Sequence, residues 1–298
     1  MQLRTALSLT ITTLVLAACD NPNQPESAEP TTTYIAFTSD REGNEDIFVL
    51  TPHDGTVRNL TNHPAADTDP DWSPDGRWIA FTSQRDGNAD VFVMDAAGDQ
   101  IRNVTPNPAF DGFPDWSPDG SRLAFTSYRD GNSDIYTMDL ASGAVHNLTQ
   151  CDAFDILPVW SPDGTRIAFV SKRHHNWDLY LMNATGGGLT RLTHDSGVDV
   201  EPTWSPDGSR IAFTSIRDGN DEIYVIDVDG TGLARITHNP AFDGFPAWSP
   251  DGHGIAFTSV RDGNEEIYSM NPDGSRIRRL TVSPAKDRFP RWRPQRGS

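Results

Sequence analysis

"WSPDG" stands at Trp72–Gly76, and the same five residues begin again at 116, 160, 204 and 248, each copy 44 residues after the one before. A sixth copy is due at Trp292, where the chain reads "WRPQR". The triplets "IAF" or "LAF" that begin at 35, 79, 123, 167, 211 and 255 keep the same spacing. Residues 34–292 are therefore one 44-residue unit in six copies, without insertion or deletion, and a repeat of this length decides the fold.

Each unit predicts four short β-strands. In the second copy these are residues 67–72 ("DTDPDW"), 78–83 ("WIAFTS"), 90–95 ("DVFVMD") and 101–105 ("IRNVT"), which have strand length and carry β-branched or aromatic residues. Four strands in about 44 residues are typical of a propeller blade. We therefore predict an all-β fold, a six-bladed β-propeller of four-stranded antiparallel blades.

The two ends of the repeat region predict how the ring closes. The first unit begins at Tyr34 with a second-strand sequence, whereas "DRFPRW" at Asp287–Trp292 is an inner strand with no second strand after it. Pairing of these segments completes the first blade and removes two free sheet edges. "SPDG" has the residues of a type I turn, so Asp75 and its equivalents are interpreted as turn residues rather than as catalytic acids.

The N-terminus indicates export. "MQLRTALSLTITTLVLAACD" has one arginine, an apolar run and small residues before Cys19, and its apolar run is too short for the alternative of an uncleaved anchor. "LAAC" resembles a bacterial lipobox, which implies lipidation of Cys19, and Asp20 resembles an inner-membrane retention signal. We expect a signal peptide at 1–18, lipidated Cys19 and a flexible tether at 19–33, and the propeller at 34–298. The expected location is the periplasmic side of the bacterial cell envelope, with the inner membrane favoured.

Composition limits the partners. The formal net charge of −18 predicts repulsion of nucleic acid and of anionic lipid, and attraction of basic protein segments and divalent metals. After lipidation of Cys19, Cys151 is the only other thiol, so no intramolecular disulfide is possible. Cys151 is interpreted as a small buried or half-buried side chain, with a reactive thiol as the alternative.

An aspartate stands five residues before every tryptophan of the repeat, and we call these six the ring aspartates: Asp67, Asp111, Asp155, Asp199, Asp243 and Asp287. Because each enters an inner strand, we expect six carboxylates around one mouth of the channel. Two ways of compensating their negative charge stay open. One is bidentate pairing between neighbouring blades with an arginine of each unit: Arg41, Arg85, Arg129, Arg173, Arg217 and Arg261. The other is a basic partner segment, or Ca²⁺ held by Asp111, Asp155, Asp199 and Asp243.

Two further patterns are weaker. "DGNxD" at Asp86–Asp90 matches the first ligand positions of an EF-hand loop, but it also suits a hairpin turn. The fourth unit replaces "RDGN" with "RHHN", which places His174, His175 and Trp177 beside an unusual "DIL" after the ring position. We leave three interpretations open for this patch: sequence drift, partner recognition, or a transition-metal site with Asp155.

The repeated pattern "WSPDG..IAFTS.RDGN.(D/E)IY......G....LT" resembles the propeller repeats of the TolB family, also called WD40-like or PD40 repeats. The resemblance covers the whole repeat region. It implies a propeller that binds partner proteins at one end of its channel, where calcium ions are found. TolB proteins carry a mixed α/β domain before the propeller, whereas only a short tether separates Cys19 from Tyr34 here. We expect a TolB-like propeller lipoprotein without that domain.

The sequence thus predicts a monomeric, non-enzymatic lipoprotein, attached to the membrane through its N-terminal lipid alone. Its acidic channel mouth would bind a protein or peptide partner with a basic segment, and Ca²⁺ is the one cofactor considered. The alternative is a calcium-dependent propeller hydrolase or lyase with its active site at the same mouth. A third option is an accessory subunit that docks to a complex. No GxSxG or HExxH motif is present.

Overall fold

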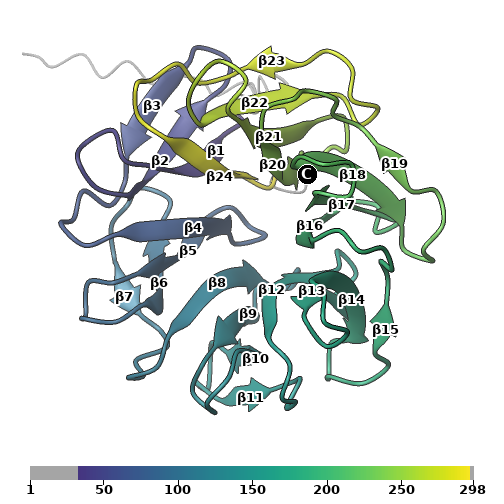
Figure 1. Ribbon diagram of the computed structural model, residues 1–298. Coiled ribbons are helices and arrows are strands. Elements are labelled where there is room, and N and C mark those ends of the chain that lie inside the picture. The colour runs from purple at the N-terminus through teal and green to yellow at the C-terminus, as the bar shows by residue number, and fades with distance from the viewer. Residues whose placement is uncertain (1–32, 296–298) are drawn as a thin grey trace, which may run out of the picture. The chain divides into compact units, whose positions relative to one another are not determined.

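The computed structural model describes residues 33–295. These residues form six four-stranded sheets arranged as blades around a central axis, with one strand of each blade nearest the axis (Figure 1). All the pairings within the blades are antiparallel. The predicted all-β, six-bladed propeller is therefore confirmed.

The strands are given blade by blade, from the axis outward. Blade 1 consists of β24 (Asp287–Trp292), β1 (Ile35–Ser39), β2 (Asp46–Thr51) and β3 (Thr56–Asn59), and blade 2 of β4 (Asp67–Trp72), β5 (Trp78–Ser83), β6 (Asp90–Asp95) and β7 (Arg102–Asn103). Blade 3 consists of β8 (Asp111–Trp116), β9 (Arg122–Ser127), β10 (Asp134–Asp139) and β11 (Val145–Asn147), and blade 4 of β12 (Asp155–Trp160), β13 (Arg166–Ser171), β14 (Asp178–Asn183) and β15 (Thr190–Arg191). Blade 5 consists of β16 (Asp199–Trp204), β17 (Arg210–Ser215), β18 (Glu222–Asp227) and β19 (Ala234–Arg235), and blade 6 of β20 (Asp243–Trp248), β21 (Ile255–Ser259), β22 (Glu266–Met270) and β23 (Arg278–Arg279).

The ring closes as predicted, between the last strand and the first. β24 pairs with β1 in a register that places Trp292 opposite Ile35 and Asp287 opposite Ser39. The altered sixth copy of the motif then takes a new role. The guanidinium of Arg293 lies 5.1 Å from the centre of the Trp72 ring, and its Nε donates a hydrogen bond to the Gly76 carbonyl of blade 2. "WRPQR" therefore replaces a turn with a contact between the end of the closing strand and blade 2.

The hydrophobic core lies between the blades. The second strand of each blade contributes one wholly buried phenylalanine: Phe37, Phe81, Phe125, Phe169, Phe213 and Phe257. Each cluster joins residues of adjacent blades, as where Ala36 and Ile47 of blade 1 pack with Trp72 and Phe81 of blade 2. Full burial of one such ring contributes about 2–3 kcal/mol. Since every blade needs both neighbours to bury its two faces, the core is complete only when the ring is closed.

The "SPDG" segments are turns, as the sequence indicates. Gly76 N–H donates to the Ser73 carbonyl at 2.8 Å, and Gly76 has a φ of 65°, which a side chain tolerates poorly. Asp75 Oδ1 accepts hydrogen bonds from Ser73 Oγ and from the Arg77 amide. The aspartate thus holds the turn together.

The "DGN" loops join the second and third strands of a blade and hydrogen-bond to the connection that leads to the next blade. Asn88 donates from Nδ2 to the carbonyls of Asn107 and Ala109, at 2.8 and 3.1 Å, in the connection that leads to blade 3. An amide that donates in this way turns its nitrogen, not a ligand oxygen, to its neighbours, so the structure favours turn chemistry over the EF-hand interpretation.

The described residues contain no helix that could span a bilayer. The predicted signal peptide, the lipidation site Cys19 and nearly all of the tether lie outside the described residues.

Candidate binding channel

The ring aspartates are structural. All six are wholly buried. In blade 3, Arg129 Nη2 donates to Asp111 Oδ2 at 2.7 Å, Arg129 Nε donates to Ser127 Oγ at 2.9 Å, and the guanidinium stacks over the ring of Tyr136. The same ion pair forms in the other blades: Arg41–Asp287, Arg85–Asp67, Arg173–Asp155, Arg217–Asp199 and Arg261–Asp243. Burial raises the pKa of Asp111, and its bonds to Ser127 and Arg129 lower it.

This placement corrects two expectations. The pairs lie within a blade rather than between neighbours, and each uses one guanidinium nitrogen rather than a bidentate fork. The carboxylates do not line the channel, and those of Asp111, Asp155, Asp199 and Asp243 do not converge on a Ca²⁺ position, because each accepts from its own arginine.

A β-bulge explains the difference. In blade 2 the pairing of β4 with β5 shifts register between Thr68 and Asp71, and Asp69 has a φ of 53°. The residue two positions after every ring aspartate has a positive φ, between 53° and 60°, although none of the six is glycine. The bulge interrupts the alternation of side chains along the strand. The ring aspartate therefore points into the blade, and the residues two and four positions later face the axis.

Two layers of side chains line the channel. The residues two positions after the ring aspartates form the upper layer: Asp69, Phe113, Leu157, Glu201, Phe245 and Phe289. The residues four positions after them form the lower layer: Asp71, Asp115, Val159, Thr203, Ala247 and Arg291. A cavity of about 280 Å³ lies at the upper layer, and a second, of about 340 Å³, lies between the lower layer and the "WSPDG" tryptophans. Both contact Asp115, Val159 and Arg291, so they are the two ends of one channel.

The upper layer holds two acids among apolar side chains. Glu201 Oε2 accepts from Thr214 Oγ1 at 2.6 Å and from the Phe245 amide at 2.8 Å. Asp69 Oδ2 accepts from Thr68 Oγ1 at 2.7 Å. Burial raises the pKa of Glu201 to about 7 and raises the pKa of Asp69 as well. The upper layer can therefore take up either protons or a cation near neutral pH.

The lower layer carries its own cation. Asp71 accepts from the amide of Trp116 at 2.9 Å, and Asp115 accepts from the amide of Trp160 at 2.7 Å. Burial raises the pKa of Asp71 to about 6, and burial together with the charge of Asp71 raises the pKa of Asp115. The positive charge of Arg291 opposes both shifts. The lower layer thus contains one guanidinium and two acids, and one of these acids is readily protonated. Its net charge is therefore close to zero.

Aromatic residues lead from the rim of one face into the channel. Tyr128 packs on Phe110, with ring centres 5.2 Å apart, and Phe110 packs on Phe113 at 5.8 Å. Phe154 lies on the same rim, and 47% of Tyr128 and 49% of Phe154 are exposed. The ring of Phe110 needs Gly112, because a Cβ there would lie 2.6 Å from it.

Phe242 and Phe245 of blade 6 form a similar pair, and Phe245 also contacts Phe289 of blade 1, with ring centres 4.4 Å apart. "AFDGFP", which occurs in blades 3 and 6, is thus the sequence of an aromatic path into the channel.

The unusual loop of blade 4 keeps the contacts of its neighbours. His174 Nδ1 contacts the hydroxyl of Tyr180, where Asp130 of blade 3 accepts from Tyr136. Trp177 lies under the ammonium of Lys172, 5.5 Å from the ring centre. His174, His175 and Asp155 do not form a metal-binding group in the part of the chain that the structure describes. The metal interpretation of this patch therefore gains no support.

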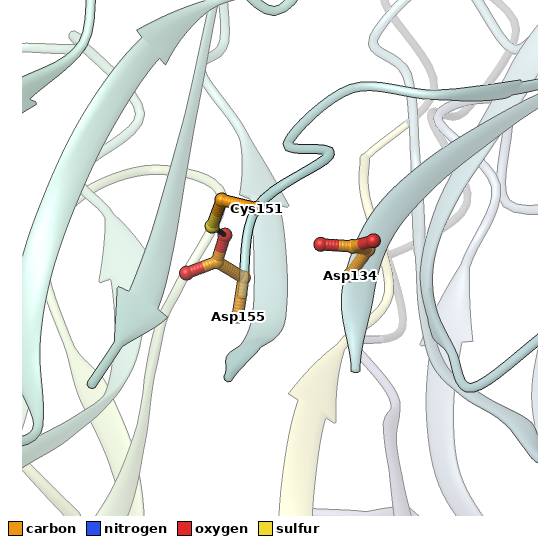
Figure 2. Close-up of side chains that lie close together, drawn as sticks. All are labelled: Asp134, Cys151 and Asp155. Carbon is orange, nitrogen blue, oxygen red and sulfur yellow. Dashed lines mark hydrogen bonds between the residues drawn. The ribbon is translucent and has the colours of Figure 1, made fainter. Parts of the chain in front are cut away.

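A different group has the right composition for a metal. Ligand atoms of Asp134, Cys151 and Asp155 lie within 4.8 Å of one another, and Figure 2 shows the thiol beside Asp155 with Asp134 on a separate strand. Arg173 Nη2, however, lies 2.6 Å from Asp155 Oδ2 and 3.5 Å from Cys151 Sγ. A guanidinium already supplies the positive charge there. Cys151 is half-buried, as expected, and burial raises the pKa of its thiol.

The sequence interpretation missed the two channel layers. Their signal is the contrast between neighbouring positions, because the ring aspartate, the proline three residues on and the tryptophan five residues on are invariant in six blades. The two channel-facing positions between them carry acids, aromatics, aliphatics, one threonine and one arginine. Variation inside an otherwise uniform strand marked the channel wall.

Comparison with known proteins agrees with this fold. Residues 12–112, 113–221 and 196–298 match the family model described as the TolB beta propeller domain. TolB from Acinetobacter baumannii is 23% identical, with a TM-score of 0.80 over 89% of this chain and 68% of its own. The putative TolB from Agrobacterium tumefaciens is 27% identical, with a TM-score of 0.71 over 87% of this chain and 90% of its own.

Oligogalacturonate lyase from Vibrio parahaemolyticus is 17% identical, with a TM-score of 0.58 over 84% of this chain and 74% of its own. At that identity the likeness concerns the fold alone. No curated protein sequence matches the chain.

Proposed function

Because the chain belongs to the TolB β-propeller family, we propose that it is a cell-envelope binding protein whose propeller holds a protein or peptide partner at the aromatic mouth of its channel. The observation that carries the proposal is the exposed rim of Tyr128 and Phe154, which continues through Phe110 and Phe113 into the channel. Protein interfaces are enriched in such aromatic residues, and hot spots cluster where they enter a pocket.

This mouth lies on the face that the sequence indicated, but the residues that line it are different ones. The acids available to a partner there are Asp69 and Glu201, not the ring aspartates, which are paired and buried. A basic group of the partner would therefore enter the channel itself, while apolar groups would cover the rim. His175 and Trp177 lie in the loop next to Lys172 and extend the same face.

Location follows from the N-terminal sequence. We propose export, lipidation of Cys19 and residence on the periplasmic side of the envelope, with the inner membrane favoured by Asp20 and the lipid as the contact with the membrane. A monomer that avoids nucleic acid fits the strongly acidic composition.

The alternative, a calcium-dependent hydrolase or lyase, has one supporting circumstance, the shared propeller fold of oligogalacturonate lyase. Fold alone does not carry an activity. In the described part of the chain, the channel acids do not gather into a group of three that could hold a metal. Binding is thus the function that the channel supports best, and Ca²⁺ in it stays a proposal that calorimetric titration tests.

The test is photo-crosslinking in intact cells. A photoreactive phenylalanine analogue replaces Phe154 at the rim, and a matched variant carries it at Thr165, an exposed residue in the "SPDG" turn on the other face. We expect a discrete protein adduct from position 154 and none from position 165. Adducts from position 165 alone, or the same adducts from both positions, would refute the assignment of the partner to this mouth.

A further inference from the structure

The upper channel layer has a pseudo-twofold pattern. Around the ring, blades 1 to 3 contribute Phe289, Asp69 and Phe113, and blades 4 to 6 contribute Leu157, Glu201 and Phe245. Each half is thus an acid between two apolar side chains. Since the blades of Asp69 and Glu201 are three apart in a ring of six, the two carboxylates lie on opposite walls of the cavity.

Neither of these carboxylates has a cationic partner. Their hydrogen bonds come from Thr68, from Thr214 and from the Phe245 amide, and neither forms an ion pair with a Lys, Arg or His side chain between residues 33 and 295. Arg291 of the lower layer also lines this cavity, and its charge opposes the raised pKa of Asp69 and of Glu201, as it does for Asp71 and Asp115. One guanidinium shared among four acids leaves the channel with an excess of carboxylates. Two carboxylates without an ion-pair partner in a mostly apolar cavity are costly to ionise.

We propose that the channel binds a linear aliphatic diamine. One ammonium group pairs with Asp69 and the other with Glu201, while the methylene chain lies against Phe113, Leu157 and Phe245. The aromatic faces add cation–π attraction. The inference concerns the same channel as the proposed function and names a ligand for its interior.

The geometry favours a diamine over a metal ion. Ca²⁺ takes roughly six to eight oxygen ligands, whereas the two acids are separated by apolar walls and belong to no metal-binding group in the described residues. A ligand with a single ammonium group would pair with one carboxylate and leave the other unpaired. The cavity of about 280 Å³ is also large enough to hold a short diamine.

Calorimetric titration of the purified full chain with cadaverine tests the proposal. Asp69→Asn and Glu201→Gln each remove one charge with little change of shape, and we expect each to weaken binding by about tenfold or more, as loss of a charge-assisted hydrogen bond does. Glu42→Gln is the matched control, because Glu42 is an exposed acid in the "EGN" loop of blade 1, where it accepts from Asn59, and lies outside the channel. It should bind cadaverine as the wild type does.

Three ligands separate the alternatives. Pentylamine has only one ammonium group, so it should bind at least about tenfold more weakly than cadaverine. Equal binding of the side-chain analogue Nα-acetyllysine amide would overturn the two-headed ligand and assign the site to a lysine of a partner. Ca²⁺ that binds and displaces cadaverine would overturn the proposal in favour of a metal.

Absence of cadaverine binding, with the circular dichroism of a folded β-protein, would also overturn it. The Phe154 adduct separates this failure from failure of the proposed function, because a partner that still crosslinks would leave the binding role of the rim intact.

Discussion

Two sets of carboxylates stand two residues apart on the inner strands, and they differ in repetition, in exposure and in ion pairing. Asp111 and its five equivalents are identical in all blades, wholly buried and paired with an arginine of the same blade. The upper channel layer has an acid in only two blades, and Asp69 and Glu201 line a cavity that also contains Arg291 but form no ion pair with it. What repeats in this chain holds the fold together, and what varies lines the channel. Substitutions in each set should therefore change the free energy of unfolding in opposite directions.

The largest effect is expected where a repeated pair is broken. Arg129→Ala leaves the carboxylate of Asp111 buried without its cation, and it also removes the guanidinium from Ser127 and from the ring of Tyr136. Breaking a buried ion pair from one side costs about 3–5 kcal/mol. Urea denaturation, followed by tryptophan fluorescence, should therefore show a loss of this size in the free energy of unfolding.

Arg77→Ala provides the comparison. Arg77 forms an exposed ion pair with Asp75 across 3.8 Å, and its loss should cost less than about 1 kcal/mol. If Arg129→Ala costs no more than Arg77→Ala, the ring aspartates do not have the structural role assigned to them.

In the channel, by contrast, removing a charged side chain is expected to increase the stability of the fold at neutral and higher pH. Burial raises the pKa of Glu201 from 4.5 to about 7, so the folded chain binds this proton more tightly than the unfolded chain. The stability of the wild type should therefore fall as the pH rises from about 4.5 to about 7, by about 3 kcal/mol from this group. Glu201→Gln does not titrate, so it should raise the melting temperature at about pH 8 and leave it nearly unchanged at about pH 4. The charged groups that act on Glu201 are Asp221 and Arg291, with Asp69 and Asp115 on the facing walls.

Asp119→Asn is the matched acid-to-amide control, in an exposed "SPDG" turn. Hydrogen bonds from Ser117 and from Ser121 lower the pKa of Asp119 to about 2, so its stabilising contribution is present above about pH 3.8 and is lost towards pH 2. Its replacement should lower stability at neutral pH, by less than about 1 kcal/mol because the group is exposed. A pH-independent effect of Glu201→Gln would show that its carboxylate is not the uncompensated acid that the channel geometry indicates.

The fold could be predicted from the sequence almost completely, because every blade carries the same strand and turn signals. Even the closure of β24 on β1 followed from the phase of Tyr34 and Trp292. The channel could not be predicted in the same way. Simple alternation along a strand places the ring aspartates on the axis, and the bulge that moves them into the blade lies at Asp69, Phe113 and their equivalents, none of which is the glycine that a positive φ normally requires.

The smallest effect tests whether the fourth blade belongs to the repeated or to the varied part of the molecule. His175 has a φ of 68° at a position where the other five blades have glycine, with φ between 101° and 109°. A left-handed conformation costs a non-glycine residue about 1–2 kcal/mol. Glycine avoids this cost, but its greater chain entropy in the unfolded state offsets about 0.5–1 kcal/mol of the gain. His175→Gly should therefore raise the free energy of unfolding by less than about 1 kcal/mol, measured by urea denaturation. His174→Asp is its control, because aspartate in that position accepts from the tyrosine hydroxyl in three other blades, and its stability should match the wild type. A stabilised His175→Gly variant that keeps the Phe154 adduct identifies "RHHN" as drift within the fold. A variant that loses the adduct instead places the loop with the channel layers, as variation retained for binding.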